Sequence, residues 1–193
     1  MKYSVLAAMI VLMTAVGCKK EKDSKPATVA SIDFLVNGSP TQGNYDFFSF
    51  ANGAKVAASD SNSTKWDFAM RFETMIVNSK ASGPGNAGVQ VLSQPFDAVI
   101  TAPETGYRFD TTSAQKAIKG SEWYVYIDRS FAPIAGKTFV FRTATNKYAK
   151  LEIVSADALD AAGNVLSPQS TQRPTTIKYR IRFAYQADGT RNF

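Results

Sequence analysis

The chain has 193 residues, of which 45% are hydrophobic and 12% aromatic, and its formal net charge at pH 7 is +6. This length and composition predict one domain with a substantial core and leave too little chain for two full domains. Histidine is absent, which excludes Ser-His-Asp and Cys-His catalysis and the usual zinc sites, so we expect a protein that is not an enzyme. The basic residues are dispersed and form no compact patch, so we expect no nucleic-acid binding.

The first 17 residues are predicted to be a lipoprotein signal peptide. Lys2 precedes an apolar run, Val5 to Met13, that is too short to span a membrane, and small residues then precede Cys18. Cys18 is the only cysteine in the sequence, so no internal disulfide can form. Its position directly after the signal peptide leads us to expect acylation of Cys18, on its thiol and at its new amino terminus. Two or more acyl chains then anchor the protein stably in a membrane. The alternative is a signal peptide cleaved elsewhere, with Cys18 incidental.

The lipidated Cys18 and a flexible tether are expected to occupy residues 18–28. This stretch is charged and polar and has no apolar face, which is typical of a disordered linker. The remaining residues, 29–193, are predicted to form the folded domain.

Strand patterns begin at Ser31–Val36, which alternates apolar and polar residues and ends at an Asn-Gly turn signal. Asn44–Phe72 follows, with three short strands separated by two polar turns. Its last strand, Lys65–Phe72, has strict period-two patterning and is predicted to be half buried. The face predicted to be buried comprises Trp66, Phe68, Met70 and Phe72, and the opposite face comprises Lys65, Asp67, Ala69 and Arg71.

The middle of the chain is less regular. Ser79–Gly88 is a glycine-rich loop, either a flexible connector or a surface that a ligand approaches closely. Val89–Leu92 and Phe96–Ile100 are short apolar runs, and Thr111–Lys119 has spacing compatible with one or two turns of helix.

The second half of the chain returns to strands. Trp123–Ile127 is predicted to place Trp123, Val125 and Ile127 on one side and Tyr124, Tyr126 and Asp128 on the other. A hairpin is expected from Thr138–Thr143 and Tyr148–Val154, followed by a long polar insertion, Asp157–Pro174, and a regular strand, Thr175–Tyr185. With many strands and almost no helix, the chain is predicted to be all-β, a single antiparallel β-rich domain.

Several of these blocks, in this order, resemble the HmuY family, the secreted haem-binding lipoproteins of Bacteroidetes. The matching motifs are F-S-F-x-x-G-x-x-V at Phe48–Val56, K-W-D-x-A at Lys65–Ala69, P-x-x-G-Y at Pro103–Tyr107, W-x-x-[FY] at Trp123–Tyr126, and the hairpin at Thr138–Val154. The resemblance implies an HmuY-like fold in a protein that is lipid-anchored at the outer membrane, with surface display as one possibility. It also implies capture of haem, bound as a ligand, for uptake through an outer-membrane TonB-dependent transporter.

The family holds haem iron between two histidines, or methionines in some relatives, and this chain has no histidine. One family ligand position corresponds to Asp128. We therefore expect Tyr124, Tyr126 and Asp128 to contact the porphyrin, with Met75 as a further candidate and Tyr126 as the ligand of the iron. Packing in a core or interface is the alternative for each aromatic residue and for Met75. The alternative function is a surface interaction or structural lipoprotein that keeps the fold and binds no haem.

Overall fold

A computed structural model describes residues 25–127 and 130–193 of the chain. The predicted signal peptide, Cys18 and most of the predicted tether lie outside these residues, as does Asp128. The described strands are β1 (Thr28–Asn37), β2 (Asp46–Ser49), β3 (Ala54–Val56), β4 (Phe68–Arg71), β5 (Thr74–Val77), β6 (Gly88–Leu92), β7 (Tyr124–Ile127), β8 (Ser130–Pro133), β9 (Thr138–Arg142), β10 (Tyr148–Leu159) and β11 (Thr176–Gln186). Three short 3-10 helices accompany them, η1 (Ala58–Asp60), η2 (Phe96–Ala98) and η3 (Gly120–Glu122).

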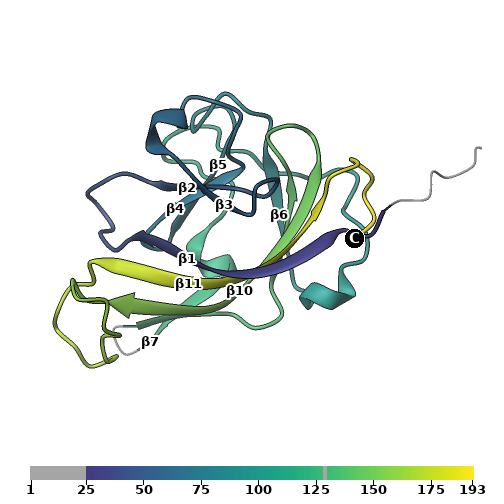
Figure 1. The fold of residues 1–193 in the computed structure, drawn as a ribbon. Coiled ribbons are helices and arrows are strands. Elements are labelled where there is room, and N and C mark those ends of the chain that lie inside the picture. Colours follow the sequence, from purple (N-terminus) through teal and green to yellow (C-terminus); the bar gives the residue numbers. More distant parts are fainter. Residues whose placement is uncertain (1–24, 128–129) are drawn as a thin grey trace, which may run out of the picture.

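The strands form two sheets and a separate ribbon, as Figure 1 shows. One sheet has the order β1-β11-β10-β9-β6, the other has the order β3-β2-β4-β5, and β7 pairs with β8. Every pairing between these strands is antiparallel. The predicted all-β antiparallel architecture is therefore confirmed.

The two sheets face each other across a core rich in phenylalanine. Both sheets contribute rings to one contiguous cluster, with centroids of neighbouring rings 5.0 to 5.8 Å apart. This spacing is typical of favourable edge-on and tilted aromatic contacts, which add to the free energy gained by burial. The phenylalanines that make these contacts are Phe34, Phe48, Phe50, Phe68, Phe141 and Phe183.

The burial predicted for Trp66, Phe68 and Met70 is confirmed, but the strand pattern predicted for Lys65–Phe72 is wrong in two respects. The chain bends at Asp67, and β4 begins only at Phe68. Because the bend interrupts the alternation, Trp66 packs in a different cluster from Phe68, together with Phe47, Ala69 and Ile76. The face predicted to be solvated is therefore buried at Asp67 and Ala69, and the four-stranded sheet has a core on each side.

The loop that precedes β4 covers this second cluster. Asn78 lies beneath the loop, fully buried, and its side-chain amide donates to the carbonyl oxygens of Ser63 at 2.8 Å and Trp66 at 2.7 Å. A Cβ at Gly83 would lie only 2.2 Å from the Asn78 Oδ1 atom and 2.6 Å from the Trp66 ring. Gly83 therefore allows the 79–88 loop to pack closely against Asn78 and Trp66. This role differs from both predictions for the loop, a flexible connector and a surface that a ligand approaches closely.

The five-stranded sheet is also covered on its outer face, by the segment that contains η2. Lys150 on β10 is buried there, and its Nζ atom donates to the carbonyl oxygens of Phe96 and Val99, each at 2.8 Å. Burial lowers the pKa of Lys150. A buried charged group needs hydrogen-bond partners in the protein to replace those it loses in water. The two bonds of the Lys150 amine supply these partners and fix η2 to the sheet.

The helical turn predicted over Thr111–Lys119 is absent, and this segment is irregular. The fully buried carboxylate of Asp110 accepts the backbone N–H groups of Ala117 at 2.7 Å and Val77 at 3.0 Å, which fixes the segment against β5. These bonds satisfy backbone donors without a helix. Within the described ranges, no helix has the length and hydrophobicity that a membrane span requires.

The predicted hairpin in the second half is confirmed as β9 and β10, but β10 continues to Leu159 instead of ending at Val154. The predicted polar insertion is correspondingly shorter at its start, since its first residues extend the strand. The strand predicted at Thr175–Tyr185 is confirmed as β11, at Thr176–Gln186.

Candidate functional site

The residues predicted to contact a porphyrin belong to the β7–β8 ribbon. Trp123 anchors the base of this ribbon and is almost fully buried, with its ring 4.8 Å from Tyr124 and 6.1 Å from Tyr179 of β11. Phe131 on β8 packs on Phe72, which lies in the turn between β4 and β5, at 5.4 Å. The ribbon is therefore fixed to the end of the sandwich where β4 meets β5.

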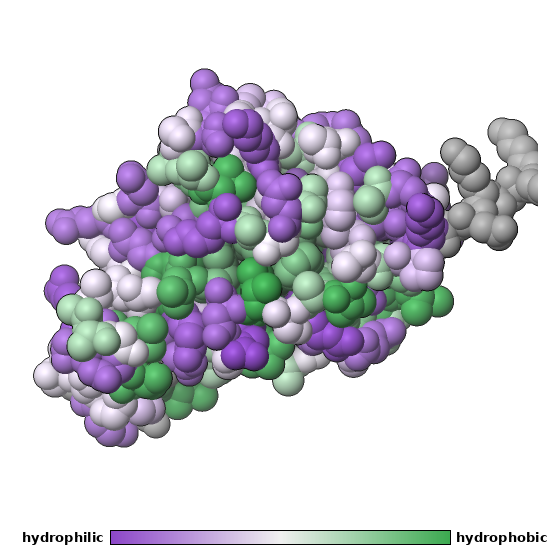
Figure 2. Space-filling view, in the orientation of Figure 1, coloured by the Kyte–Doolittle hydropathy of each residue, from purple (hydrophilic) through white to green (hydrophobic). Residues whose placement is uncertain are grey.

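The prediction that Trp123 shares a face with Val125 and Ile127 is wrong. Trp123 is the C-cap residue that follows η3, with φ −137° and ψ −15°, which is not an extended conformation, so the alternation begins anew at Tyr124. Trp123 enters the core, whereas Val125, Tyr126 and Ile127 are 43%, 64% and 61% exposed. In Figure 2, hydrophobic residues lie among hydrophilic ones at the lower left, where Figure 1 places β7, and further hydrophobic surface lies along the centre and right of this face.

The two predicted tyrosines occupy different environments. Tyr124 is half buried, with its ring 5.6 Å from Phe131, and burial together with the charge of Glu73 raises its pKa. Tyr126 lies on the surface of the ribbon, where its phenol is accessible. The structure therefore separates the predicted group into an inner tyrosine that packs and an outer tyrosine that is available to a ligand.

Met75 is a core residue. It is only 2% exposed, lies on β5, and pairs with Met70 of β4 in the register of the hairpin. Its sulfur belongs to the main hydrophobic cluster, which corresponds to the packing alternative.

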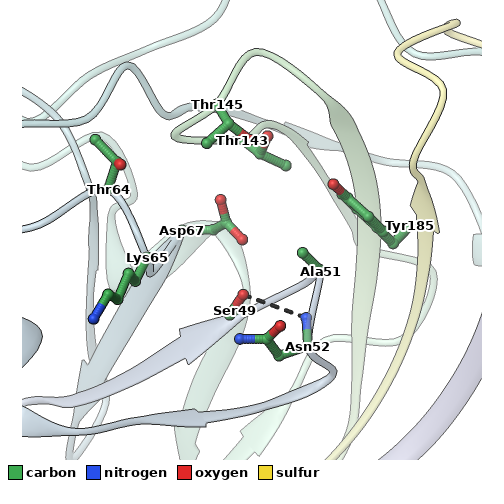
Figure 3. Close-up of a pocket in the computed structure, with 9 residues that line it drawn as sticks. All are labelled: Ser49, Ala51, Asn52, Thr64, Lys65, Asp67, Thr143, Thr145 and Tyr185. Carbon is green, nitrogen blue, oxygen red and sulfur yellow. Dashed lines mark hydrogen bonds between the residues drawn. The ribbon is translucent and has the colours of Figure 1, made fainter.

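Sequence reasoning missed a second site, a pocket of about 300 Å³ at one end of the sandwich. Figure 3 shows the Asp67 carboxylate near its centre, with side chains from both sheets around it. The lining residues are Ser49, Ala51, Asn52, Thr64, Lys65, Asp67, Thr143, Thr145 and Tyr185. Neither this pocket nor the open hollow around Asn37, Asp46 and Pro174 includes a residue of the ribbon.

Asp67 forms the floor of this pocket and is 5% exposed. Its Oδ2 atom accepts the backbone N–H of Phe50 at 2.8 Å, and its Oδ1 atom accepts that of Ala144 at 2.9 Å. Burial raises the pKa of Asp67 to about 6, although both hydrogen bonds act in the opposite direction. Asp67 forms no salt bridge with any lysine or arginine of the described chain.

The rim of the pocket is formed mainly by hydroxyl groups. Tyr185 points its hydroxyl toward Asp67 in Figure 3, and the charge of Asp67 adds to burial in raising the Tyr185 pKa. Lys65 directs its amine away from the pocket, toward Asp60, with Nζ 2.8 Å from the Asp60 Oδ1 atom. The pocket thus combines one buried anionic group with polar neighbours that can both donate and accept.

One sequence signal could have indicated this site. Asp67 lies between Trp66 and Phe68, and an acidic residue between two large aromatic residues is a candidate for a buried, hydrogen-bonded carboxylate. The partners of that carboxylate, which lie 17 and 77 residues away, are not visible in the local pattern.

No family model and no curated protein matches the chain. Among solved structures, the chain is similar to a protein from Bacteroides vulgatus described as HmuY-like and heme-binding, with a TM-score of 0.45, 12% identity, and coverage of 81% of this chain and 92% of the other. It is also similar to a protein from Bacteroides fragilis described as a lipoprotein, with a TM-score of 0.46, 14% identity, and coverage of 81% and 91%. Likeness of this extent identifies neither a ligand nor a site.

Proposed function

We propose that this protein is a lipid-anchored, non-enzymatic binding protein that captures haem or a related porphyrin on the β7–β8 ribbon. The observation that carries the proposal is the exposure of three consecutive side chains, Val125, Tyr126 and Ile127, on a two-stranded ribbon. Apolar side chains that gather on an exposed element are typical of a binding site, whereas single exposed ones are not. The motif at Trp123–Tyr126, which resembles the ligand-bearing strand of the HmuY family, supports the same location.

The ribbon suits a flat, apolar ligand. Val125 and Ile127 lie on one face of β7 and Tyr126 on the other, and both faces are accessible. Burying apolar area contributes about 25 cal/mol per Å², less the costs of association, so stacking on the ribbon supplies most of the affinity in this proposal. Iron coordination then has a secondary role, which is consistent with a chain that lacks histidine.

Tyr126 is the proposed ligand of the iron. Tyrosinate is an established haem ligand, and the Tyr126 phenol is accessible. Tyr124 is less suitable, because its raised pKa disfavours the phenolate and its ring is engaged by Trp123 and Phe131. We assign Tyr124 to stacking and positioning.

The ribbon lies at the end of the domain opposite the start of β1. Thr28 pairs with Tyr185 near the end of β11, whereas the ribbon packs on Tyr179, six residues earlier along the same strand. Six residues of extended strand span about 20 Å. A domain held to the outer membrane through Cys18 therefore has its ribbon on the far side of the anchor, where a transfer partner such as a TonB-dependent transporter could reach it.

A haemin titration followed by absorbance tests this proposal. A saturable shift of the Soret band at a stoichiometry of about one haem per chain is expected. A spectrum equal to the sum of free haemin and protein would contradict it and favour the alternative of a surface interaction lipoprotein with no bound haem.

A further inference from the structure

We propose that the pocket around Asp67 is a second binding site, which takes a small ligand through a primary ammonium group, such as ethanolamine or the ethanolamine headgroup of a phospholipid. This inference does not depend on haem binding, because the pocket and the ribbon lie at opposite ends of β11.

The first argument is the state of the Asp67 carboxylate. It is 95% buried, yet no cation of the described chain pairs with it, and each of its oxygens accepts only one backbone N–H. A carboxylate oxygen can accept two hydrogen bonds, so one lone pair on each oxygen is available to the pocket. A buried anion without a counter-ion is costly, and a ligand that supplies a positive charge with N–H donors removes that cost.

The second argument is the composition of the rim. Among the described residues, the Tyr185 hydroxyl, the Thr64 hydroxyl and the side-chain amide of Asn52 form no hydrogen bond with another protein group, so all three are available to a ligand. The backbone N–H of Asn52 donates to the Ser49 Oγ atom at 3.4 Å. Hydroxyl and amide oxygens are acceptors for the three donors of an ammonium group. The Tyr185 ring also borders the pocket, and a cation near an aromatic ring gains further stabilisation.

The size and donor set of the pocket limit the ligand. A volume of about 300 Å³ is at the lower end for small-molecule sites, which favours a ligand of a few atoms. A calcium or magnesium ion is a poor fit, because Asp67 is the only carboxylate that lines the pocket and such ions take about six or more oxygen ligands. In the described chain, no group of three acidic, cysteine or histidine side chains is placed to hold a metal.

The position of the pocket favours a membrane source for the ammonium group. Tyr185 at its rim pairs with Thr28, ten residues after Cys18. Ten residues span at most about 35 Å, so an acylated Cys18 would hold the pocket near the lipid headgroups.

Calorimetric titration with ethanolamine, glycerophosphoethanolamine and choline tests this inference. Ethanolamine should bind saturably at about pH 7.5, and choline, which lacks N–H donors, at least about tenfold more weakly. Tighter binding of glycerophosphoethanolamine than of ethanolamine would assign the headgroup as the source, and weaker binding would assign a free amine. Equal binding of choline and ethanolamine, or no binding of either, would overturn the proposal.

Two variants and a matched control locate the binding. Asp67→Asn should abolish ethanolamine binding, and Tyr185→Phe, which leaves the carboxylate in place, should weaken it several-fold. Asp60→Asn removes a carboxylate that faces Lys65 outside the pocket and should leave the affinity unchanged. If Asp67→Asn does not fold, the test is the ethanolamine affinity of Tyr185→Phe compared with that of Asp60→Asn. Equal affinities in these two variants would contradict the site.

The affinity should also depend on pH. Ethanolamine binding should be about tenfold weaker at about pH 5 than at pH 7.5, because Asp67 with a pKa of about 6 is mostly protonated at the lower value. Lys65 and Tyr185 are the other titratable side chains that line the pocket, and Asp60 faces Lys65. The same pH profile in Asp60→Asn is expected, and loss of the profile in that variant would contradict the assignment to Asp67.

Discussion

Ala144 donates its backbone N–H to the Oδ1 atom of Asp67 at 2.9 Å, across 77 residues of chain. Asp67 immediately precedes β4 of the four-stranded sheet, whereas Ala144 lies in the turn between β9 and β10 of the five-stranded sheet. The second oxygen of the same carboxylate accepts the N–H of Phe50, which follows β2. One buried acidic side chain therefore joins the two sheets at the end of the sandwich.

This relationship predicts a pH-dependent stability. The pKa of Asp67 is about 6 in the folded chain and close to 3.9 in the unfolded chain, so the folded state holds the proton more tightly. The extra stability that protonation of Asp67 gives the folded state is fully present below about pH 4 and is lost as the pH rises toward 6 and above. The change corresponds to roughly 3 kcal/mol in the free energy of unfolding at most.

Asp67→Asn isolates this effect from the other acidic groups. The amide can accept one of the two backbone N–H groups but faces the other with its own N–H donors, which costs about 1–3 kcal/mol. Urea unfolding at about pH 4 and pH 7.5 should show a larger stability advantage of the wild type at the lower pH. An advantage that is equal at both values would show that Asp67 does not titrate as its burial implies.

Trp66 provides a test of the second core. Its indole Nε1–H donates to the Ser61 carbonyl at 2.9 Å and its ring packs 4.8 Å from Phe47. Trp66→Ala should lower the free energy of unfolding by about 3–5 kcal/mol, a large part of the total for a domain of this size. Lys65→Ala should change it by less than about 0.5 kcal/mol, since Lys65 makes only an exposed ion pair. Similar melting temperatures for the two variants would contradict the burial of Trp66.

The two ribbon tyrosines should have separable effects on haem binding. Tyr126→Phe removes the proposed iron ligand and keeps the ring, so it should change the ferric absorption spectrum and largely preserve affinity. Tyr124→Ala should weaken affinity itself, because it removes aromatic contacts with Trp123 and Phe131. Unaltered haemin affinity and spectrum in both variants would place the haem elsewhere.

Anchoring through Cys18 remains a prediction from the sequence alone. Metabolic labelling with an alkyne analogue of palmitate should mark the wild type and not Cys18→Ser, because the thiol and the new amino terminus of Cys18 are the expected acylation sites. Absence of label in the wild type would contradict lipid anchoring.

The sequence predicted the fold class because strand alternation is local, and β9, β10 and β11 carry it clearly. Trp66 is buried as predicted, but the assignment of faces failed at Trp66 and Trp123, where a bend or a helical turn next to the strand changes which face the following residues occupy. It also failed at Ala69, because burial of that face depends on a loop held by Asn78. The Asp67 pocket could not be predicted, since its walls come from segments that only the tertiary fold brings together.

The central claim, that the exposed apolar ribbon holds the porphyrin, is tested most directly by haemin affinity in two matched variants. Tyr126 on the ribbon is 64% exposed, and Ile100, outside the ribbon, is 69% exposed, so Tyr126→Ser and Ile100→Ser each remove an exposed apolar side chain, one from the proposed haem face and one from another surface. Removing an apolar contact of this size should cost about 1–2 kcal/mol of binding free energy, or roughly five- to thirtyfold in affinity. Tyr126→Ser should show that loss while Ile100→Ser binds as the wild type, and equal affinities in the two variants would contradict the ribbon as the haem site.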